Sequence, residues 1–194
     1  MIHTVQGDIF NAKTEAIVNP VNCVGVMGKG LALAFKDRFP DNYIIYRKLC
    51  KAHRLKVGQV FTYCFAKPEG ELRYIVNFPT KDHWRDSSKL SYIERGLVSL
   101  ATAIRETPIH SIAIPPLGCG LGGLDWAIVK PMIESALQDL DCAVYLYDRR
   151  WDACTSITSR IRKTRRISTG TASSVPSAKP TRRPGCRSST SSSR

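Results

Sequence analysis

A glycine-rich loop interrupts the apolar pattern of the chain after residue 114. The apolar run Ser111–Ile114 stops at Pro115 and Pro116, and four glycines follow within residues 118–123, before Asp125 offers a helix N-cap. Because glycine has no Cβ, its backbone can turn sharply and bring N–H groups close to an anion, and a helix start adds free donors. The succession of strand, glycine loop and helix therefore indicates a phosphate-bearing ligand, with an ordinary tight turn as the alternative.

A second glycine loop covers residues 22–31 and also follows an apolar run, at residues 16–18. Two such loops, each between an expected strand and an expected helix, can close on one diphosphate from both sides. Neither loop is a mononucleotide P-loop, because Lys29 is followed by Gly30 and Leu31 instead of the required Ser or Thr. Neither loop fits the dinucleotide fingerprint with its acidic partner about 20 residues later.

The basic charge of the chain is concentrated at its C-terminal end. The formal net charge of the 194 residues is +13, and residues 151–194 contribute +9 of it, against +4 from residues 1–150. These last 44 residues contain 18 Ser or Thr and few large apolar side chains, so we expect a disordered tail. This tail is either a solvated linker or an arm that attracts nucleic acid, built on Arg160, Arg162, Lys163, Arg165 and Arg166.

Seven cysteines occur without a Cys-x-x-Cys pair and without a His/Cys cluster at zinc spacing. We therefore expect free thiols, no metal site and a reducing, cytoplasmic location. The N-terminal residues do not resemble a secretory leader, and no window has the apolar length of a membrane helix.

Short apolar runs alternate with longer stretches of helical period. Strands are expected at residues 2–6, 16–19, 59–65, 73–78, Ser111–Ile114 and Ala143–Tyr147. Helices are expected at residues 31–39, 41–50 with Asp41 as a cap, Leu90–Glu106, and about 130–139 with Pro131 in the first turn. This interleaving predicts an α/β fold of three layers, in which both glycine loops lie beyond the carboxyl ends of strands, where ligands bind.

Four motifs occur in the order that a known family shows. They are Gly7-Asp8-Ile9, Asn19-Pro20-Val21-Asn22, the loop Gly25 to Gly30, and the loop Pro116 to Gly123. This set resembles the macrodomain, an ADP-ribose-binding fold. The resemblance covers residues 1–150 and implies a macrodomain-type α/β/α sandwich with a central mixed sheet, with residues 151–194 as a separate tail.

Within this family, the segment from Asn77 to Arg85 and the loop after residue 117 look most like the macrodomain of the DarG antitoxins. DarG removes ADP-ribose that the DarT toxin places on thymidine in single-stranded DNA. The resemblance implies an ADP-ribosyl glycohydrolase without cofactors, whose partners are ADP-ribose, ADP-ribosylated single-stranded DNA and a DarT-like ADP-ribosyltransferase toxin. DarG continues into a second globular domain, whereas this chain continues after Asp148 into the Ser/Arg-rich tail, so only de-modification of DNA is implied. A hydrolase of protein-linked ADP-ribose and a non-catalytic ADP-ribose reader remain as alternatives.

The resemblance also assigns the ends of the ligand. The Asp8 carboxylate would accept a hydrogen bond from the adenine amine, and Ile9 would offer its N–H and an apolar face. Asn22 would bind the distal ribose, with a smaller contribution from Asn19. Ordinary roles are the alternatives: a turn aspartate for Asp8 and loop-stabilising amides for the two asparagines.

The glycine loops would hold the diphosphate. Their ADP-ribose-binding residues by resemblance are Val26, Met27, Gly28, Lys29, Gly30, Pro116, Leu117, Gly118, Cys119, Gly120, Leu121 and Gly122. The Lys29 ammonium either neutralises a phosphate or remains solvated. Cys119 is not expected to be a nucleophile, because no histidine is fixed beside it by the sequence.

Lys81 is the expected catalytic residue, with an ordinary surface lysine as the alternative. A neutral lysine amine can attack the anomeric carbon of the ribose, or its ring-opened aldehyde, and form a covalent intermediate. The site must then lower the pKa of this lysine by burial or by a nearby cation such as Lys29 or Arg85. The following residues, His83, Trp84 and Arg85, could stack on unpaired DNA bases, unless the tryptophan is a buried anchor of the loop.

Overall fold

The computed structural model describes residues 1–65 and 72–148, and the expected tail lies outside them. Its elements in chain order are β1 (Ile2–Val5), the 3-10 turn η1 (Ile9–Asn11), β2 (Ala16–Val21), α1 (Gly30–Arg38), α2 (Pro40–Lys51), β3 (Phe61–Cys64), β4 (Tyr74–Pro79), α3 (Leu90–Glu106), β5 (Ser111–Ile114), α4 (Trp126–Leu137) and β6 (Ala143–Tyr147). None of the helices within these ranges has the length and apolar character that crossing a bilayer requires.

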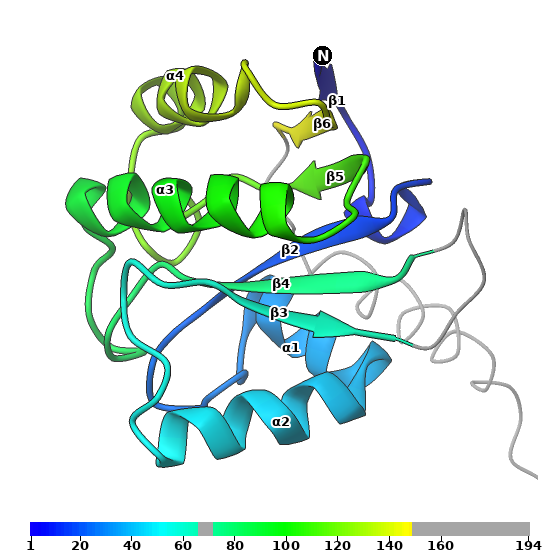
Figure 1. Cartoon of the computed structure of the whole chain (residues 1–194). Coiled ribbons are helices and arrows are strands. Elements are labelled where there is room, and N and C mark those ends of the chain that lie inside the picture. The colour runs from blue at the N-terminus through cyan, green and yellow to red at the C-terminus, as the bar shows by residue number, and fades with distance from the viewer. Residues whose placement is uncertain (66–71, 149–194) are drawn as a thin grey trace, which may run out of the picture. The chain divides into compact units, whose positions relative to one another are not determined.

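The strands form one sheet in the order β1-β6-β5-β2-β4-β3 (Figure 1). All neighbours are parallel except β3, which pairs with β4 in the antiparallel direction. The expected central mixed sheet is therefore confirmed. Because β1, β2, β4 and β5 run in the same direction, the segments that follow them leave the sheet at one edge.

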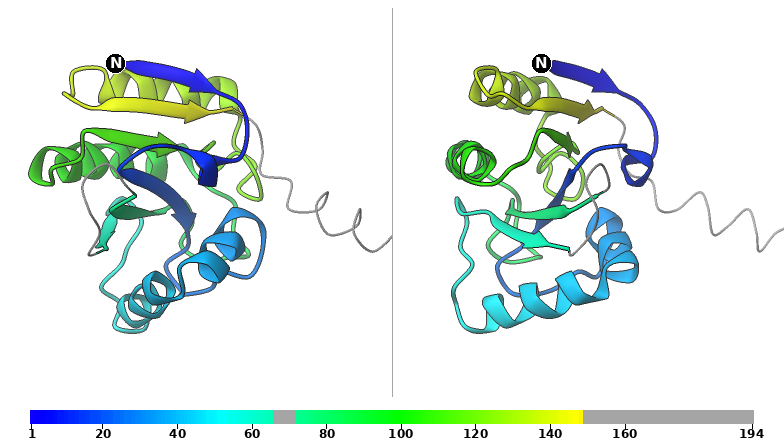
Figure 2. Two further views of the ribbon diagram at one scale, coloured as in Figure 1. Left: turned by 90° about the vertical axis from the view of Figure 1, so that its right-hand side faces the viewer. Right: turned by 45° about the vertical axis from the view of Figure 1, so that its right-hand side comes forward.

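Helices cover both faces of the sheet, with α3 and α4 on one side and α1 and α2 on the other (Figure 2). The strand residues alternate accordingly: Ala16 and Val18 of β2 belong to the core under α3 and α4, whereas Ile17 packs with Phe35 of α1. A third cluster joins Tyr46 of α2 to the end of β2. The three-layer α/β/α arrangement is confirmed.

Helix α4 begins four residues before the expected start. Asp125 is its N-cap, and its Oδ1 accepts a hydrogen bond from the Ala127 N–H at 2.9 Å. Pro131 lies inside the helix, where its missing N–H leaves the Ala127 carbonyl without its helical donor. Ala127 is exposed, so water can satisfy that carbonyl, and the buried stripe through Val129 and Ile133 holds the helix together.

Helix α2 begins at Pro40, one residue before the expected cap. Proline is tolerated at the first helical position because the N–H there has no helical acceptor, so Pro40 both ends α1 and starts α2. Asp41 lies in the first turn, where its charge is favourable next to the helix N-terminus.

Strand β2 runs two residues past its expected end and includes Pro20. The pairing of β2 with β5 covers only Ala16 and Ile17, whereas its pairing with β4 continues to Val21. Pro20 therefore lies where β2 has already separated from β5. This separation opens the carboxyl edge of the sheet between the two segments that contain the glycine loops.

Candidate functional site

Two loops leave the separated ends of β2 and β5 and meet again above the edge of the sheet. We call residues 22–30 loop 1 and residues 115–125 loop 2. A Cβ atom added at Gly30 would lie 3.9 Å from Cδ1 of Leu121, so the far ends of the loops are in near contact. The structure thus brings together the two segments that the sequence predicts to close on one ligand.

Asn22 organises the backbone of loop 1. Its Nδ2 donates to the Val26 carbonyl at 2.6 Å, and its Oδ1 accepts from the Val24 and Val26 N–H groups at 3.1 and 3.3 Å. The Tyr46 hydroxyl donates to the Asn22 carbonyl at 2.8 Å and lies 3.1 Å from its Oδ1. Burial raises the pKa of Tyr46 far above its usual range, so the phenol remains a donor. Loop 1 is consequently fixed to α2 before any ligand arrives.

Loop 2 is closed by its own backbone and by Ser88. The Ser88 N–H donates to the Gly122 carbonyl, and the Leu124 N–H donates to the Gly118 carbonyl, both at 3.0 Å. A Cβ at Gly122 would collide with the Gly118 carbonyl oxygen and with the Ser88 Oγ. A Cβ at Gly120 would meet nothing within 4 Å. Gly122 is therefore required by the packing of the loop, whereas Gly120 faces open space.

Lys81 lies at the junction of the two loops. It follows β4, and the backbone on either side of it is bonded to the β2 end: Thr80 N–H donates to Val21 at 3.0 Å, and Cys23 N–H donates to the Asp82 carbonyl at 2.9 Å. Its Nζ donates to the Leu121 carbonyl of loop 2 at 2.5 Å. The backbone around Lys81 is thus bonded to the end of β2 and to loop 1, and its amine is bonded to loop 2.

The pKa of Lys81 is lowered from the ordinary lysine value. Burial is the larger cause, because it disfavours the charged ammonium, and the nearby Asp86 carboxylate opposes it. In this structure, burial is therefore the source of the lowered pKa, and neither Lys29 nor Arg85 contributes to it. A larger share of this amine is neutral near pH 7 than for a solvated lysine.

Asp8 follows β1 at the same edge of the sheet. Its Oδ1 accepts from the Phe10 N–H at 2.9 Å, which caps η1, and its Oδ2 lies 3.8 Å from the guanidinium of Arg38. That guanidinium also lies 4.1 Å from the Phe10 ring centre. Ile9 is buried under this group. Asp8 therefore caps η1 in this structure, and its contact with adenine stays a prediction. Its neighbour Arg38 was not predicted from the sequence.

Three buried asparagines lie beneath loop 1. Asn19 donates to Asn77 Oδ1 at 3.0 Å and to the Met27 sulfur at 3.9 Å, while its own Oδ1 has no partner among the described residues. Asn77 and Asn42 exchange hydrogen bonds at 2.7 and 3.3 Å. Asn19 is fully buried, so in this structure its amide supports loop 1 from below. Its predicted ribose contact is not tested by this arrangement.

Asn42→Ala is expected to destabilise the fold by about 2–3 kcal/mol, because it removes both hydrogen bonds between the buried Asn42 and Asn77 amides. Urea unfolding followed by fluorescence measures the loss. The adjacent, exposed Asp41 provides the control, since Asp41→Ala removes a helix-end charge worth about 0.3–1 kcal/mol. Equal stability of the two variants would show that the asparagine cluster contributes nothing.

The other predicted loop residues divide between the surface and the core. Val26, Gly28, Lys29, Gly120 and Leu121 are exposed, whereas Met27, Leu117, Gly118, Cys119 and Gly122 are buried, and Gly30 and Pro116 are intermediate. Cys119 belongs to the core under α3 and α4, and its thiol donates to the Leu117 carbonyl at 3.3 Å. The predicted absence of a nucleophilic role for Cys119 is not tested by this placement.

The segment after Lys81 presents an aromatic side chain to solvent. Trp84 is 47% exposed, its ring lies 5.4 Å from the His83 ring, and the Arg85 guanidinium lies 4.6 Å from the indole centre. Trp84 is therefore not the buried anchor that the sequence left open. A flat group of this kind can stack on an unpaired base, and its role in DNA binding stays a prediction.

Comparison with known proteins agrees with this geometry. The Macro domain family model matches residues 18–133. The DNA ADP-ribosyl glycohydrolase of Mycobacterium tuberculosis is 49% identical over 148 residues, which cover 75% of this chain and 42% of that protein. The protein of the same name from Thermus aquaticus is 48% identical over 149 residues, or 76% of this chain and 41% of the relative.

Solved structures show the same fold. The macrodomain of Mycobacterium tuberculosis DarG superimposes with a TM-score of 0.74 at 49% identity, over 76% of this chain and 97% of that one. The structure of Thermosipho africanus DarTG in complex with ADP-ribose matches with a TM-score of 0.69 at 36% identity, over 75% of this chain and 41% of that one. The chain spans about four tenths of the length of the two curated relatives. With its mixed sheet, its paired glycine loops and these matches, the chain belongs to the macrodomain family.

Proposed function

We propose that this protein is an ADP-ribosyl glycohydrolase that removes ADP-ribose from a nucleobase of single-stranded DNA, with thymidine as the base. The observation that carries the proposal is the position of the Lys81 amine, which is bonded to the glycine-rich loop 2 and has a pKa lowered by burial. The names of the relatives, DNA ADP-ribosyl glycohydrolase and DarTG in complex with ADP-ribose, support the ligand and the reaction.

In the proposed arrangement the adenine end lies beside Asp8 and the diphosphate between loops 1 and 2. Gly28 and Gly120 are exposed and have no Cβ, so their backbone can approach phosphate oxygens. The distal ribose then lies beside the Lys81 amine and the Leu121 carbonyl, which are joined by a hydrogen bond. The exposed Trp84 favours a base over a protein side chain as the group beyond the ribose.

The proposed chemistry uses Lys81 as a nucleophile. Its neutral amine attacks the anomeric carbon of the ribose and loses a proton, while the bond to the base nitrogen breaks with its electron pair going to the base. The base takes a proton, and the lysine holds the ribose as a covalent adduct that reaches the imine when the ring opens. Water then hydrolyses the adduct, which releases ADP-ribose and restores the amine.

The test uses the full chain and a single-stranded oligonucleotide that carries ADP-ribosylated thymidine. Release of free ADP-ribose is expected, together with a borohydride-trapped adduct that peptide mass spectrometry locates on Lys81. If ADP-ribose is released from a modified protein but not from the oligonucleotide, the substrate is protein-linked ADP-ribose and not modified DNA. Tight binding of ADP-ribose without release from either substrate would make the protein a reader.

Asp86→Asn is expected to move the rising limb of kcat/KM against pH to lower pH. The Asp86 carboxylate raises the pKa of Lys81, so its neutralisation leaves burial unopposed and favours the neutral amine at lower pH. A pH–rate profile on the same oligonucleotide measures the shift. The exposed Asp139, beyond the end of α4, is the control, because Asp139→Asn makes the same charge change away from the site. An upward shift, or the same shift in both variants, would contradict this electrostatic coupling.

A further inference from the structure

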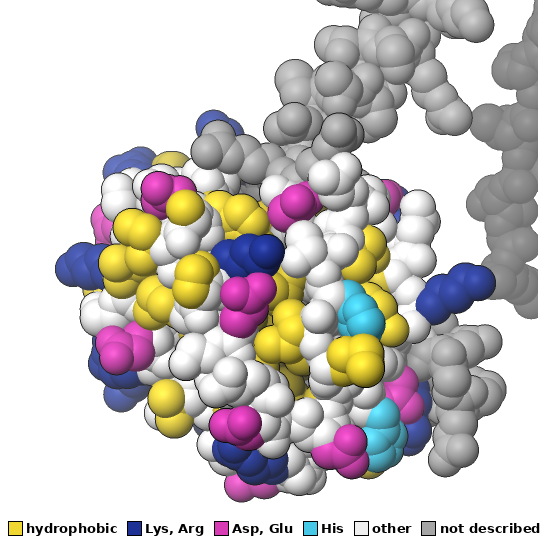
Figure 3. All heavy atoms as spheres, turned by 90° about the horizontal axis from the view of Figure 1, so that it is seen from above, with side chains coloured by type: hydrophobic (Ala, Val, Ile, Leu, Met, Phe, Trp, Pro, Cys, Tyr) yellow, Lys and Arg dark blue, Asp and Glu magenta, His cyan; other side chains and the backbone are white. Residues whose placement is uncertain are grey.

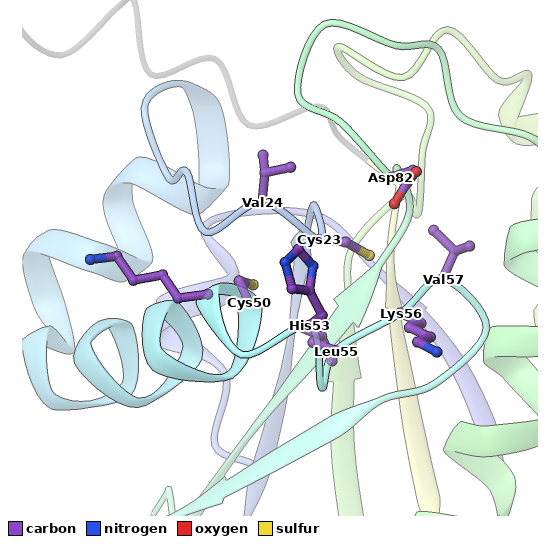
Figure 4. Close-up of a pocket in the computed structure, with 9 residues that line it drawn as sticks. Cys23, Val24, Cys50, His53, Leu55, Lys56, Val57 and Asp82 are labelled. Atoms are coloured by element: carbon purple, nitrogen blue, oxygen red, sulfur yellow. The ribbon is translucent and has the colours of Figure 1, made fainter.

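A cavity of about 620 Å³ lies beside loop 1 and is lined by no residue of loop 2 (Figure 4). Cys23 and Val24 of loop 1 form one side, Cys50 and the segment from His53 to Val57 form another, and Asp82 closes it. The hydrogen bond from Cys23 N–H to the Asp82 carbonyl, at 2.9 Å, belongs to this wall. Because Asp82 directly follows Lys81, the cavity begins one residue away from the proposed nucleophile.

The rim of this cavity is strongly basic. The end of α2 and the segment after it contribute five exposed cations and no acid between residues 42 and 65: Arg47, Lys48, Lys51, Arg54 and Lys56. None of them forms an ion pair with a carboxylate among the described residues. The face over α4 and β1 differs, because acidic, basic and hydrophobic side chains are mixed there (Figure 3).

The same basic segment touches loop 1. A Cβ at Gly25 would lie 3.4 Å from Cγ of Arg47 and 3.3 Å from Cβ of Cys50. The cations of α2 therefore begin at the glycine loop of the cleft and continue along the cavity through Lys51 and Lys56. A polyanion that leaves the cleft near Lys81 meets positive charge on this side.

His53 occupies a backbone conformation that normally favours glycine. Its φ is +54°, and it ends α2 with its N–H bonded to the Cys50 carbonyl at 3.0 Å and the Arg54 N–H bonded to Leu49 at 2.9 Å. A non-glycine residue there is disfavoured by about 1 kcal/mol. In return, the imidazole is placed at the cavity, among Cys23, Cys50 and Leu55 (Figure 4).

We propose that this cavity and its basic rim bind the nucleotide next to the modified one, so that the DNA strand leaves the cleft over loop 1 toward the end of α2. The inference deepens the proposed function and rests on it. Lys51 and Lys56 contact backbone phosphates, and the imidazole of His53 stacks on the flanking base. The Asp82 carboxylate accepts a hydrogen bond from an exocyclic amine of that base.

Cys23 and Cys50 in the cavity wall are suited to contact a base and not to react as nucleophiles. Burial, followed by the nearby Asp82 carboxylate, raises the pKa of Cys23 to about 12, and burial also raises the pKa of Cys50. Both thiols are therefore neutral at physiological pH and leave the positive potential of the rim undiminished. Apart from the Asp82 carboxylate, the cavity offers neutral and apolar walls for a base, with cations at its edge for phosphate.

The first experiment measures binding of an unmodified, fluorescein-labelled single-stranded oligonucleotide to the full chain by anisotropy at several salt concentrations. The Lys51→Glu/Lys56→Glu variant is expected to bind at least about tenfold more weakly at low salt. The slope of log K against log salt should be lower by about 1.4, since each lost phosphate contact removes about 0.7. Lys13→Glu/Arg105→Glu makes the same charge change at exposed positions before β2 and at the end of α3, and serves as the matched control.

The second experiment separates the flanking site from the reaction. The Lys51→Glu/Lys56→Glu variant should raise KM for the ADP-ribosylated oligonucleotide, with unchanged kinetics on the ADP-ribosylated mononucleoside, which has no flanking phosphate. His53→Gly should raise the melting temperature, because it relieves the positive φ, and yet weaken oligonucleotide binding.

The inference would be overturned if the Lys51→Glu/Lys56→Glu variant kept the affinity and the salt slope of the wild type. It would also be overturned if the matched control lost as much affinity for the oligonucleotide. Preference for an acidic peptide over the oligonucleotide would overturn it in favour of a protein partner. Failure of the wild type to hydrolyse either substrate, with the binding differences intact, would remove the proposed function and retain this surface as a single-strand binding site.

Discussion

Lys81→Ala is expected to slow release of ADP-ribose from the modified oligonucleotide by at least about a thousandfold, because removal of a nucleophile costs orders of magnitude in kcat. Binding of ADP-ribose should survive, since the loops and Asp8 keep their own supports. The lost hydrogen bond to Leu121 is worth about 0.5–1.5 kcal/mol, so the Kd should rise by less than about tenfold. Single-turnover kinetics and titration calorimetry measure the two quantities.

Lys81→Arg is the matched variant for this experiment. Its guanidinium preserves the positive charge and can still donate to the Leu121 carbonyl, but it stays protonated and cannot attack carbon. Both variants should therefore be inactive and fail to give a borohydride-trapped adduct. Wild-type rates in Lys81→Ala would exclude a nucleophilic lysine and would favour water activated within the cleft.

Gly122→Ala is expected to lose about 3 kcal/mol of stability together with ADP-ribose binding. The added methyl would collide with the Gly118 carbonyl and the Ser88 side chain, so loop 2 must move as a whole. Differential scanning calorimetry and titration with ADP-ribose measure both losses.

Gly120→Phe is the contrasting variant. A Cβ at Gly120 meets nothing within 4 Å and the backbone there is not in the left-handed region, so stability should change by less than about 0.5 kcal/mol. Its ring would instead fill the space that the diphosphate needs, and binding should be lost. Retained binding in Gly120→Phe would place the diphosphate elsewhere, and full stability in Gly122→Ala would show that loop 2 adapts freely.

The elements with strong local patterns were predictable from the sequence. Helix α3 carries its apolar residues on one face over seventeen residues, and its bounds agree with the expectation, as do those of β5 and β6. The predicted start of α4 near residue 130 is wrong, because the Asp125 cap and the buried stripe that follows it outweigh the hydrogen bond that Pro131 removes. Tertiary packing thus determines that the helix begins after Asp125 and not near Pro131.

The site was predictable as a meeting of two loops, but its supports were not. The bond from Lys81 to Leu121 joins residues 40 positions apart, and no local pattern specifies it. A buried hydrogen-bond partner for Asn42 could have been predicted from the sequence. Asn42 lies on the same face of the helix as Tyr46 and Cys50, and a polar side chain on a buried face needs a partner. The sequence does not indicate that this partner is Asn77, which lies on a different element.

In the proposed arrangement, the strand order sets the length that a ligand must have to reach from Asp8 to Lys81. Asp8 follows β1 and Lys81 follows β4, and the order β1-β6-β5-β2-β4 separates them by four interstrand spacings. At about 4.8 Å for each spacing, the sheet edge measures about 19 Å between them. A ligand anchored by its base at β1 reaches the lysine only if it carries a second sugar beyond the diphosphate, and a mononucleotide would stop short. The spacing between hydrogen-bonded strands therefore fixes the distance between the two ends of the ligand.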